Sequence, residues 1–239
     1  MTDKELKLRD LALSIHDFIG FGNPEADILI VGKECALDSS DITAVSIDKV
    51  TNKENCERWI EVLPPNQKEL VNWMDVPYGE SEWRRSFNPR FAFWGQRFMC
   101  NRKSPKHPDK ELTGTNRTWY NYQKLICRMF PDKAIQHGDP LNFQDLCFIT
   151  ELSSVSKRMS YEGSRTETQD SIRKRLEEFK EPFYQSFPVV IAACEGYLRS
   201  MHIDIKEIFP EAIVCRQLSM NVSDEELDRI AAEVALQLN

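Results

Sequence analysis

Polar side chains follow three apolar runs of this sequence, at the point where each run ends. Lys33 and Glu34 come after the first run, Glu151 after the second, and Gln217 and Ser219 after the last. Because the carboxyl ends of parallel strands meet at one edge of a sheet, we expect these side chains to lie along that edge. Two carboxylates, a lysine, an amide and a hydroxyl suit water activation or base recognition. The alternative is that they are ordinary polar residues at strand ends, held by local caps and ion pairs.

One segment of the chain is strongly basic, although the protein as a whole is acidic. The net charge of the chain is −7, yet the segment from Arg84 to Lys106 has no acidic residue. Its basic residues are Arg84, Arg85, Arg90, Arg97, Arg102, Lys103 and Lys106, and the aromatic residues Phe87, Phe91, Phe93, Trp94 and Phe98 are interleaved with them. Phosphates bind cations and bases stack on rings, so this composition favours nucleic-acid binding. The alternative is that the rings form the core of a subdomain and the arginines pair with acids elsewhere.

Four short aliphatic runs predict the strands that position the polar side chains. Each run is apolar throughout and is bounded by turn residues, which indicates a strand buried on both faces. The predicted strands are Asp27–Val31, Leu146–Thr150, Val189–Cys194 and Ala212–Cys215. Helical segments alternate with them, so we predict a three-layer α/β/α sandwich with a central four-stranded, mainly parallel sheet. Residues 1–239 are predicted to form a single domain, with a long elaboration at about 38–142 between the first two strands.

Apolar residues at helical spacing predict the helices. They are expected at residues 3–19, Asn55–Val62, Gln67–Met74, Thr115–Met129, Thr168–Phe179, in a short segment from Gly196 through Met201, and after Ser223. In the segment Thr115–Met129 the apolar stripe consists of Trp119, Tyr122, Ile126 and Met129. Thr166 with Gln169, and Ser223 with Glu226, are the predicted capping boxes.

Several common site types have no support in the sequence. Gly32 is not followed by the second glycine and Lys-Ser/Thr pair of a P-loop, and no G-x-G-x-x-G follows the first strand. The four histidines are scattered without metal-ligand spacing. None of the seven cysteines forms a C-x-x-C pair, and Cys147, Cys194 and Cys215 lie in or beside apolar runs. We interpret the cysteines as buried structural thiols and predict neither a metal nor a cofactor.

The bulk composition is that of a globular protein in water. A hydrophobic content of 41% and a charged content of 29% are ordinary for this class. No apolar run approaches the roughly 18 residues needed to cross a bilayer. The charged N-terminus lacks the apolar core of a signal peptide. We therefore expect a cytoplasmic monomer with no membrane partner.

The order of these elements resembles the uracil-DNA glycosylase superfamily. The segment Gly22–Gly32, with the sequence GNPEADILIVG, looks like the first-strand signature G-N-P-x-A-D-I-x-x-V-G-E-A-P-G of the thermophilic-type branch. Phe148–Leu152, followed by Arg158, resembles the second-strand pattern Y-I-T-N-x-V-K-x-R-P. By position, Arg175–Ala193 is similar to the segment with P-x-V-I-x-A-L-G, and Arg216–Ser219 falls where the family has its H-P-S loop.

The resemblance implies a role for each residue at the strand ends. Glu34 falls where the classical branch, with G-Q-D, has its water-activating aspartate. Glu151 takes the place of the base-reading asparagine, and Gln217 that of the H-P-S histidine. A carboxylate only accepts hydrogen bonds, so a base would be read differently here. The residues implied to contact the base or ligand are Gly32, Lys33, Cys35, Glu151 and Ser219, with Glu34 and Gln217 as the catalytic pair.

Three functions are compatible with the sequence. The first is hydrolysis of an N-glycosidic bond of a nucleic-acid base or nucleotide, with DNA or another nucleic acid as partner. The second is a non-catalytic nucleic-acid-binding module that keeps the fold, and the third is an interaction protein without nucleic-acid affinity. In the first two, the backbone contacts are expected from Arg84, Arg85, Arg90, Arg97 and Arg158.

Overall fold

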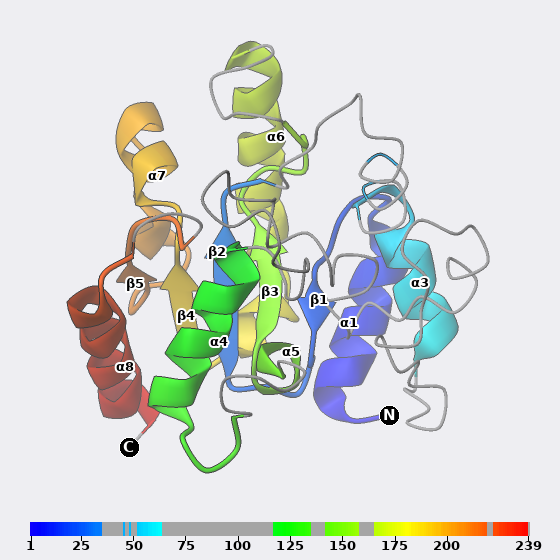
Figure 1. Ribbon diagram of the computed structural model, residues 1–239. Helices are drawn as coiled ribbons and strands as arrows, with labels where there is room; N and C mark the ends of the chain where they lie inside the picture. Colours follow the sequence, from blue (N-terminus) through cyan, green and yellow to red (C-terminus); the bar gives the residue numbers. More distant parts are fainter. Residues whose placement is uncertain are drawn as a thin grey trace, which may run out of the picture.

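The computed structural model describes residues 1–34, 45, 48, 52–63, 117–134, 142–157, 165–218 and 222–238. Within them the chain forms a five-stranded sheet of order β1-β3-β2-β4-β5 (Figure 1). The strands are β1 (Phe21–Gly22), β2 (Ile28–Gly32), β3 (Phe148–Glu151), β4 (Val189–Ala192) and β5 (Ile213–Val214). The four predicted strands are all present, and β2 to β5 run parallel. The mixed α/β class with a mostly parallel sheet is therefore confirmed.

The strand at the sheet edge was not predicted from the sequence. β1 consists of only two residues and pairs antiparallel with β3. A strand of two residues is too short to show an alternation of apolar and polar residues, so the sequence pattern does not predict it. The sheet consequently has one strand more than the four expected.

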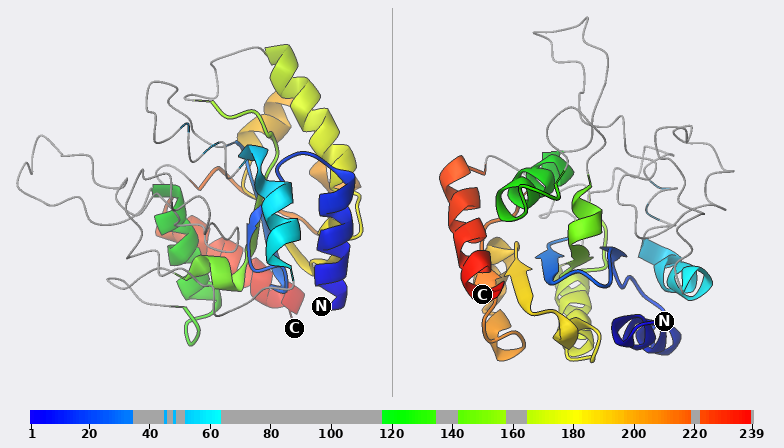
Figure 2. Two further views of the ribbon diagram at one scale, coloured as in Figure 1. Left: turned by 90° about the vertical axis from the view of Figure 1, so that its right-hand side faces the viewer. Right: turned by 90° about the horizontal axis from the view of Figure 1, so that it is seen from below.

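Helices cover both faces of the sheet, which gives the predicted three layers (Figure 2, right). On one face lie α1 (Asp3–Ser14), α3 (Asn55–Val62), α6 (Arg165–Glu178) and α7 (Glu195–Met201); on the other lie α4 (Arg117–Met129), α5 (Phe143–Leu146) and α8 (Asp224–Leu238). Successive residues of a strand point to opposite faces. Leu29 and Val31 of β2 belong to the first core, and Ile28 and Ile30 to the second. Because β2 contributes side chains to both cores, it is apolar throughout.

Two predicted helices have different limits in the structure. α1 ends at Ser14, not at residue 19, because Phe18 and Ile19 are buried in the connection to β1. There the Ile19 amide donates to Asn55 Oδ1 at 2.9 Å. α6 begins at Arg165, so Thr166 lies inside the helix and is not its cap as predicted.

Other helix predictions agree closely with the structure. The predicted helix Asn55–Val62 is present with the same limits. The last helix begins after Ser223, whose hydroxyl accepts the Glu226 amide at 3.2 Å. The predicted helix Gln67–Met74 lies outside the described residues.

The connection between α1 and β1 passes very close to β3. Gly20 has a φ of 146°, and a Cβ atom there would lie 2.4 Å from the Ile149 carbonyl oxygen. Asn55 Nδ2 and Trp59 Nε1 each donate to the Gly20 carbonyl at 2.8 Å. Only glycine fits this backbone without displacing β3. α3 therefore fixes the connection against the end of the sheet where β3 carries Glu151.

Candidate functional site

The ends of β2 and β3 leave the sheet side by side. Gly32 is in register with Glu151. Beyond that pair, the Leu152 amide donates to the Gly32 carbonyl at 2.9 Å, and the Ser153 amide donates to the Lys33 carbonyl at 2.8 Å. The ladder therefore continues past the strands, and the structure brings Lys33, Glu34 and Glu151 to adjacent strand ends. Glu34 and Glu151 are both half-buried.

Gln217 lies further along the same edge. It follows β5, and β4 separates β5 from β2. Neighbouring strands are about 4.8 Å apart, so about 10 Å separates the lines of the two backbones. Asn121 Nδ2 of α4 donates to the Leu218 carbonyl at 2.8 Å, which ties the loop after β5 to the helix. Gln217 is thus on the predicted edge but is not beside the two carboxylates in the sheet order.

The end of β2 also faces the helix that follows β4. Lys33 Nζ lies 4.3 Å from the centroid of the Tyr197 ring of α7, a cation–π arrangement. The connection from β2 contains α3 and α4 and leads to β3 on one side of β2 in the sheet, whereas the connection from β4 contains α7 and leads to β5 on the other side. Strands whose connections diverge in this way form the crevice in which ligands of open α/β sheets bind. Lys33 therefore occupies the expected ligand position.

The hydroxyl group of a tyrosine in α4 lies close to the end of β2. The Tyr122 hydroxyl oxygen lies 3.5 Å from the position that a Cβ atom would occupy at Gly32, and Glu151 Cγ lies 3.9 Å from the same position. Burial raises the pKa of the Tyr122 phenol well above its usual value, and the Glu151 charge adds to the shift. The phenol is therefore neutral. The sequence prediction placed Tyr122 only in an apolar stripe, because helical spacing gives no sign that its hydroxyl reaches a strand end.

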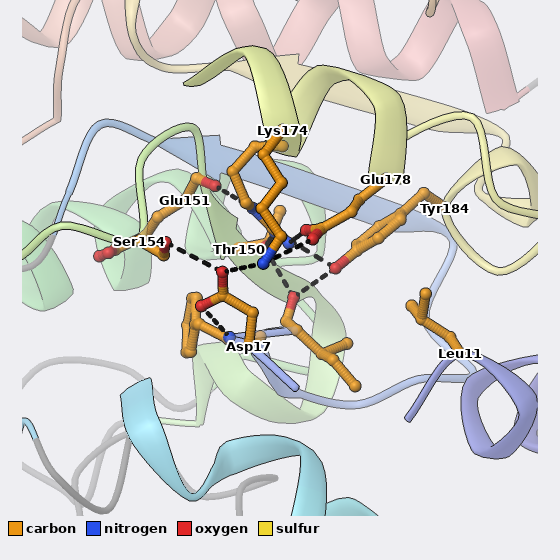
Figure 3. A network of polar contacts seen from close by, with 12 residues as sticks. Leu11, Asp17, Thr150, Glu151, Ser154, Lys174, Glu178 and Tyr184 are labelled. Carbon is orange, nitrogen blue, oxygen red and sulfur yellow. Dashed lines mark hydrogen bonds and ion pairs between the residues drawn. The ribbon is translucent and has the colours of Figure 1, made fainter. Parts of the chain in front are cut away.

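The end of β3 is held from the other face by a buried arginine (Figure 3). Arg175 is 0% exposed; its Nη2 donates to Thr150 Oγ1 at 2.6 Å, and its Nε to the Glu151 carbonyl at 3.2 Å. Nη1 forms an ion pair with Glu178. Burial alone would lower the pKa of Arg175, but Tyr184 and Glu178 outweigh it and raise the pKa. The guanidinium is therefore charged, and it fixes the main chain at Glu151.

The same network joins β3 to the connection before β1. Thr150 Oγ1 and the Tyr184 hydroxyl both donate to the Ile19 carbonyl, at 2.6 and 2.8 Å. The Tyr184 hydroxyl in turn accepts from Arg175 Nη2 at 3.2 Å. Glu151 joins this network through its main-chain oxygen, which accepts from Arg175 Nε. This face supports the site without supplying its reactive groups.

An outer ion pair extends the network toward the loop after β3. Lys174 Nζ lies 2.8 Å from Asp17 Oδ2, and the Ser154 hydroxyl donates to the same oxygen at 3.2 Å. Burial would raise the pKa of Asp17, but hydrogen bonds from Lys174 and from the Phe18 amide outweigh it and lower the pKa. The loop that follows Glu151 is thus attached both to α6 and to the connection before β1.

The cysteines of the described part are buried or half-buried thiols. Cys56, Cys147, Cys194 and Cys215 are buried and unbonded to one another. Burial raises the pKa of Cys215 to about 12, with a further contribution from Glu226. Such thiols remain protonated and unreactive at neutral pH. This agrees with their interpretation as structural residues.

Some of the predicted site residues lie outside the described part of the chain. They are Cys35, Ser219, Arg84, Arg85, Arg90, Arg97 and Arg158. The predicted base-binding and backbone-binding roles of these residues therefore remain predictions.

A surface hollow of about 670 Å³ lies beside α7, η6 (Ile205–Glu207) and β5. Its lining includes Leu198, Ile203 and Val214 but none of the predicted strand-end residues. Among the described residues, no group of three or more His, Cys, Asp or Glu side chains is arranged to bind a metal ion. None of the helices in the same residues combines the length and the apolar character that crossing a bilayer requires.

Comparisons of the chain with family models, with curated proteins and with solved structures find no significant match. What the site can do is therefore inferred from its own residues. They are two carboxylates, a lysine and a neutral phenol around the end of β2.

Proposed function

We propose that this protein hydrolyses the N-glycosidic bond of a nucleic-acid base or nucleotide, with the uracil-DNA-glycosylase-like fold that its first strand resembles. The proposal rests above all on the in-register pair of Gly32 and Glu151. This pair, with the two hydrogen bonds beyond it, brings the Glu34 and Glu151 segments together at the carboxyl edge. Adjacent carboxylates allow one to act on water while the other binds the base.

In the proposed reaction, a water molecule attacks C1′ of the sugar. The new C1′–O bond forms as the C1′–N bond breaks, and the base leaves with the electron pair of that bond. Glu34 orients the water, accepts its proton, and stabilises the positive charge that develops on the sugar. Lys33 lies beside it, and its ammonium group offsets the negative charge of the departing base.

The other residues bind the substrate in this proposal. Glu151 accepts hydrogen bonds from N–H groups of the base, and Gln217 acts near the departing base. Ser219 contacts the base or ligand. A base in a duplex must be extruded to reach the strand ends. The arginines Arg84, Arg85, Arg90, Arg97 and Arg158 then contact the phosphates.

The proposal is tested by base release from oligonucleotides that each carry one lesion, with the free base quantified by mass spectrometry. We expect release from at least one lesion, and we expect Glu34→Gln to slow it by about 10²-fold or more, because a positioned general base contributes roughly 10²- to 10⁴-fold. Glu177→Gln is the matched control, since Glu177 is an exposed carboxylate of α6 that pairs with Lys180. Its rate should equal that of the wild type.

Binding is measured on the same oligonucleotides by fluorescence anisotropy. Oligonucleotides that bind without releasing a base from any lesion would contradict hydrolysis. They would favour the non-catalytic nucleic-acid-binding alternative. An equal loss of activity in Glu34→Gln and Glu177→Gln would contradict the role of Glu34.

A further inference from the structure

The surface hollow between α7, η6 and β5 has the size and the lining of a small-molecule site. Its volume of about 670 Å³ falls within the range of roughly 300–1,000 Å³ that such sites occupy. The buried part of its lining is apolar, since Leu198 and Ile205 are 6% and 1% exposed. Ile203 and Val214, which are half-buried, extend this apolar surface toward the solvent. The hollow is therefore suited to an apolar body.

The exposed part of the lining is charged. Arg199 pairs with Glu195 at 3.2 Å, and Asp204 Oδ1 accepts the Lys206 amide at 3.0 Å. Among the described residues, no carboxylate lies within ion-pair distance of the His202 ring or of the Lys206 ammonium. Both carboxylates of the lining thus accept from within it, whereas two basic side chains keep their donors for a ligand.

His202 occupies a position that favours glycine. It ends α7 with a φ of 56° and a ψ of 44°, and it is the only non-glycine residue with a positive φ among the described residues. The Ile203 amide donates to the Leu198 carbonyl at 2.9 Å, a pattern in which glycine usually follows the helix. A histidine strains this backbone, and such strain is typical of functional positions. The side chain that the strain retains lines the hollow.

We propose that the hollow binds a small organic anion with an apolar body, such as an aromatic carboxylate or sulfonate. The apolar body covers the apolar lining, and the anionic group accepts hydrogen bonds from His202 and Lys206. The imidazole can donate in either protonation state, because the neutral ring still has one N–H. The lining contains none of the strand-end residues, so this site is independent of the proposed hydrolysis.

The test measures the binding of two fluorescent probes to the full-length protein. 8-Anilinonaphthalene-1-sulfonate combines an apolar ring system with an anionic group, and N-phenyl-1-naphthylamine has the same rings without the sulfonate. We expect one sulfonate probe to bind per chain, and the neutral probe to bind about threefold more weakly or less, as for one exposed charge contact. This difference should shrink in about 1 M NaCl, which screens exposed charges.

Substitutions of His202 separate its side chain from its backbone. His202→Gly removes the imidazole and relieves the positive φ, so binding of the sulfonate probe should weaken about threefold while the unfolding temperature stays equal or rises. His202→Ala removes the same ring but keeps the strain. It should therefore bind the probe as weakly as His202→Gly does, and it should unfold at a lower temperature than His202→Gly.

A substitution of Lys206 tests the second basic group. Lys206→Gln should weaken binding of the sulfonate probe about threefold and leave the neutral probe unaffected. Lys180→Gln is the matched control, because Lys180 is an exposed lysine that pairs with Glu177 and does not line the hollow. It should bind both probes as the wild type does.

Three results would overturn the inference. They are no binding of the sulfonate probe, equal binding of the two probes, and equal losses in Lys206→Gln and Lys180→Gln. A lower unfolding temperature in His202→Gly than in the wild type would contradict the retention of His202 for its side chain. Base release, and its dependence on Glu34, can succeed or fail without changing any of these results.

Discussion

Two buried tyrosines lie on opposite faces of the sheet, and their hydroxyls differ in one respect. Tyr184 accepts a hydrogen bond from Arg175 and donates one to the Ile19 carbonyl. Tyr122, within the described residues, forms none, although it is also buried and is close to the same strand end. Burial alone therefore does not distinguish a structural polar group from one that can serve a ligand. The hydrogen-bond partners of the group make this distinction.

The difference divides the surroundings of Glu151 into two parts. On the α6 side, Arg175 binds the main chain of Glu151 and is itself surrounded by acceptors. On the α4 side, the Tyr122 hydroxyl oxygen and Glu151 Cγ lie 3.5 and 3.9 Å from the position that a Cβ atom would occupy at Gly32. We infer that the first part holds the strand end in place, whereas the second borders the proposed site.

The largest effect is expected from Arg175→Met. This change removes a buried charge and leaves the nearly buried Glu178 carboxylate with only the half-exposed Lys174, at 3.5 Å, as an ion-pair partner among the described residues. Breaking a buried ion pair from one side costs about 3–5 kcal/mol of unfolding free energy. Urea unfolding followed by circular dichroism measures this loss.

Arg173→Met is the matched control for Arg175→Met. Its side chain is 77% exposed, and it pairs with Asp170 at 3.3 Å on the surface of the same helix. Surface changes of this kind usually stay within about 0.5 kcal/mol. Similar losses in the two variants would contradict the special role of the buried network.

A pair of glycine substitutions compares the two sides directly. Gly20→Ala places a Cβ atom 2.4 Å from the Ile149 carbonyl oxygen at a positive φ, so we expect a loss of about 1–3 kcal/mol from overpacking and further loss from strain. Gly32→Ala places its Cβ atom in ordinary contacts, so the unfolding free energy should change by less than about 1 kcal/mol.

Ligand binding should show the opposite order for the two glycines. The predicted ligand contacts include Gly32, so the added methyl group of Gly32→Ala should weaken nucleotide binding. Titration calorimetry on Gly32→Ala, with thermal unfolding of both variants, checks the pair. Normal nucleotide binding by Gly32→Ala would contradict a ligand contact at Gly32.

The smallest effect is expected from Asp17→Asn, and it depends on pH. The pKa of Asp17 is lower in the folded protein than in the unfolded chain. Its charged form therefore adds stability above the unfolded pKa of about 3.9, and this stability is lost as the pH falls through the folded pKa. Lys174 is 55% exposed, so the contribution is at most about 1 kcal/mol at neutral pH.

The sign of this contribution is checked by measuring the unfolding free energies of Asp17→Asn and of the wild type across pH. The difference between them should be present at pH 7 and should vanish in strong acid. Asp170→Asn, which removes an exposed partner of Arg173, should show no difference at either pH. A difference in unfolding free energy that increased in acid would contradict the lowered pKa of Asp17.

The sequence predicts the sheet well because its central strand is unambiguous. β2 is apolar throughout since helices cover both of its faces, and this is the pattern that a sequence displays most directly. The end of α1 was predicted too late because Phe18 and Ile19 continue its apolar spacing, although they pack in an extended connection. Apolar spacing alone does not show where a helix ends.

The site was only partly predictable for a different reason. Lys33, Glu34 and Glu151 were found because the ends of parallel strands share an edge, which follows from topology. Tyr122 and Arg175 act through atoms at the tips of long side chains. Arginine is rarely buried, so nothing in the sequence indicates that Arg175 is 0% exposed. The positions of the Tyr122 hydroxyl and the Arg175 guanidinium follow from tertiary contacts, which the sequence pattern does not show.

The central position of β2 has a consequence for how the chain folds. Its two neighbours begin at Phe148 and Val189, so most of the chain separates β2 from the strands that flank it. Pairing partners that are remote in sequence require long loops to close, which slows folding. During synthesis, Ile28–Gly32 emerges long before either neighbour exists. Until then this aliphatic segment has exposed edges, and we expect it to be the part of the nascent chain that depends most on chaperones.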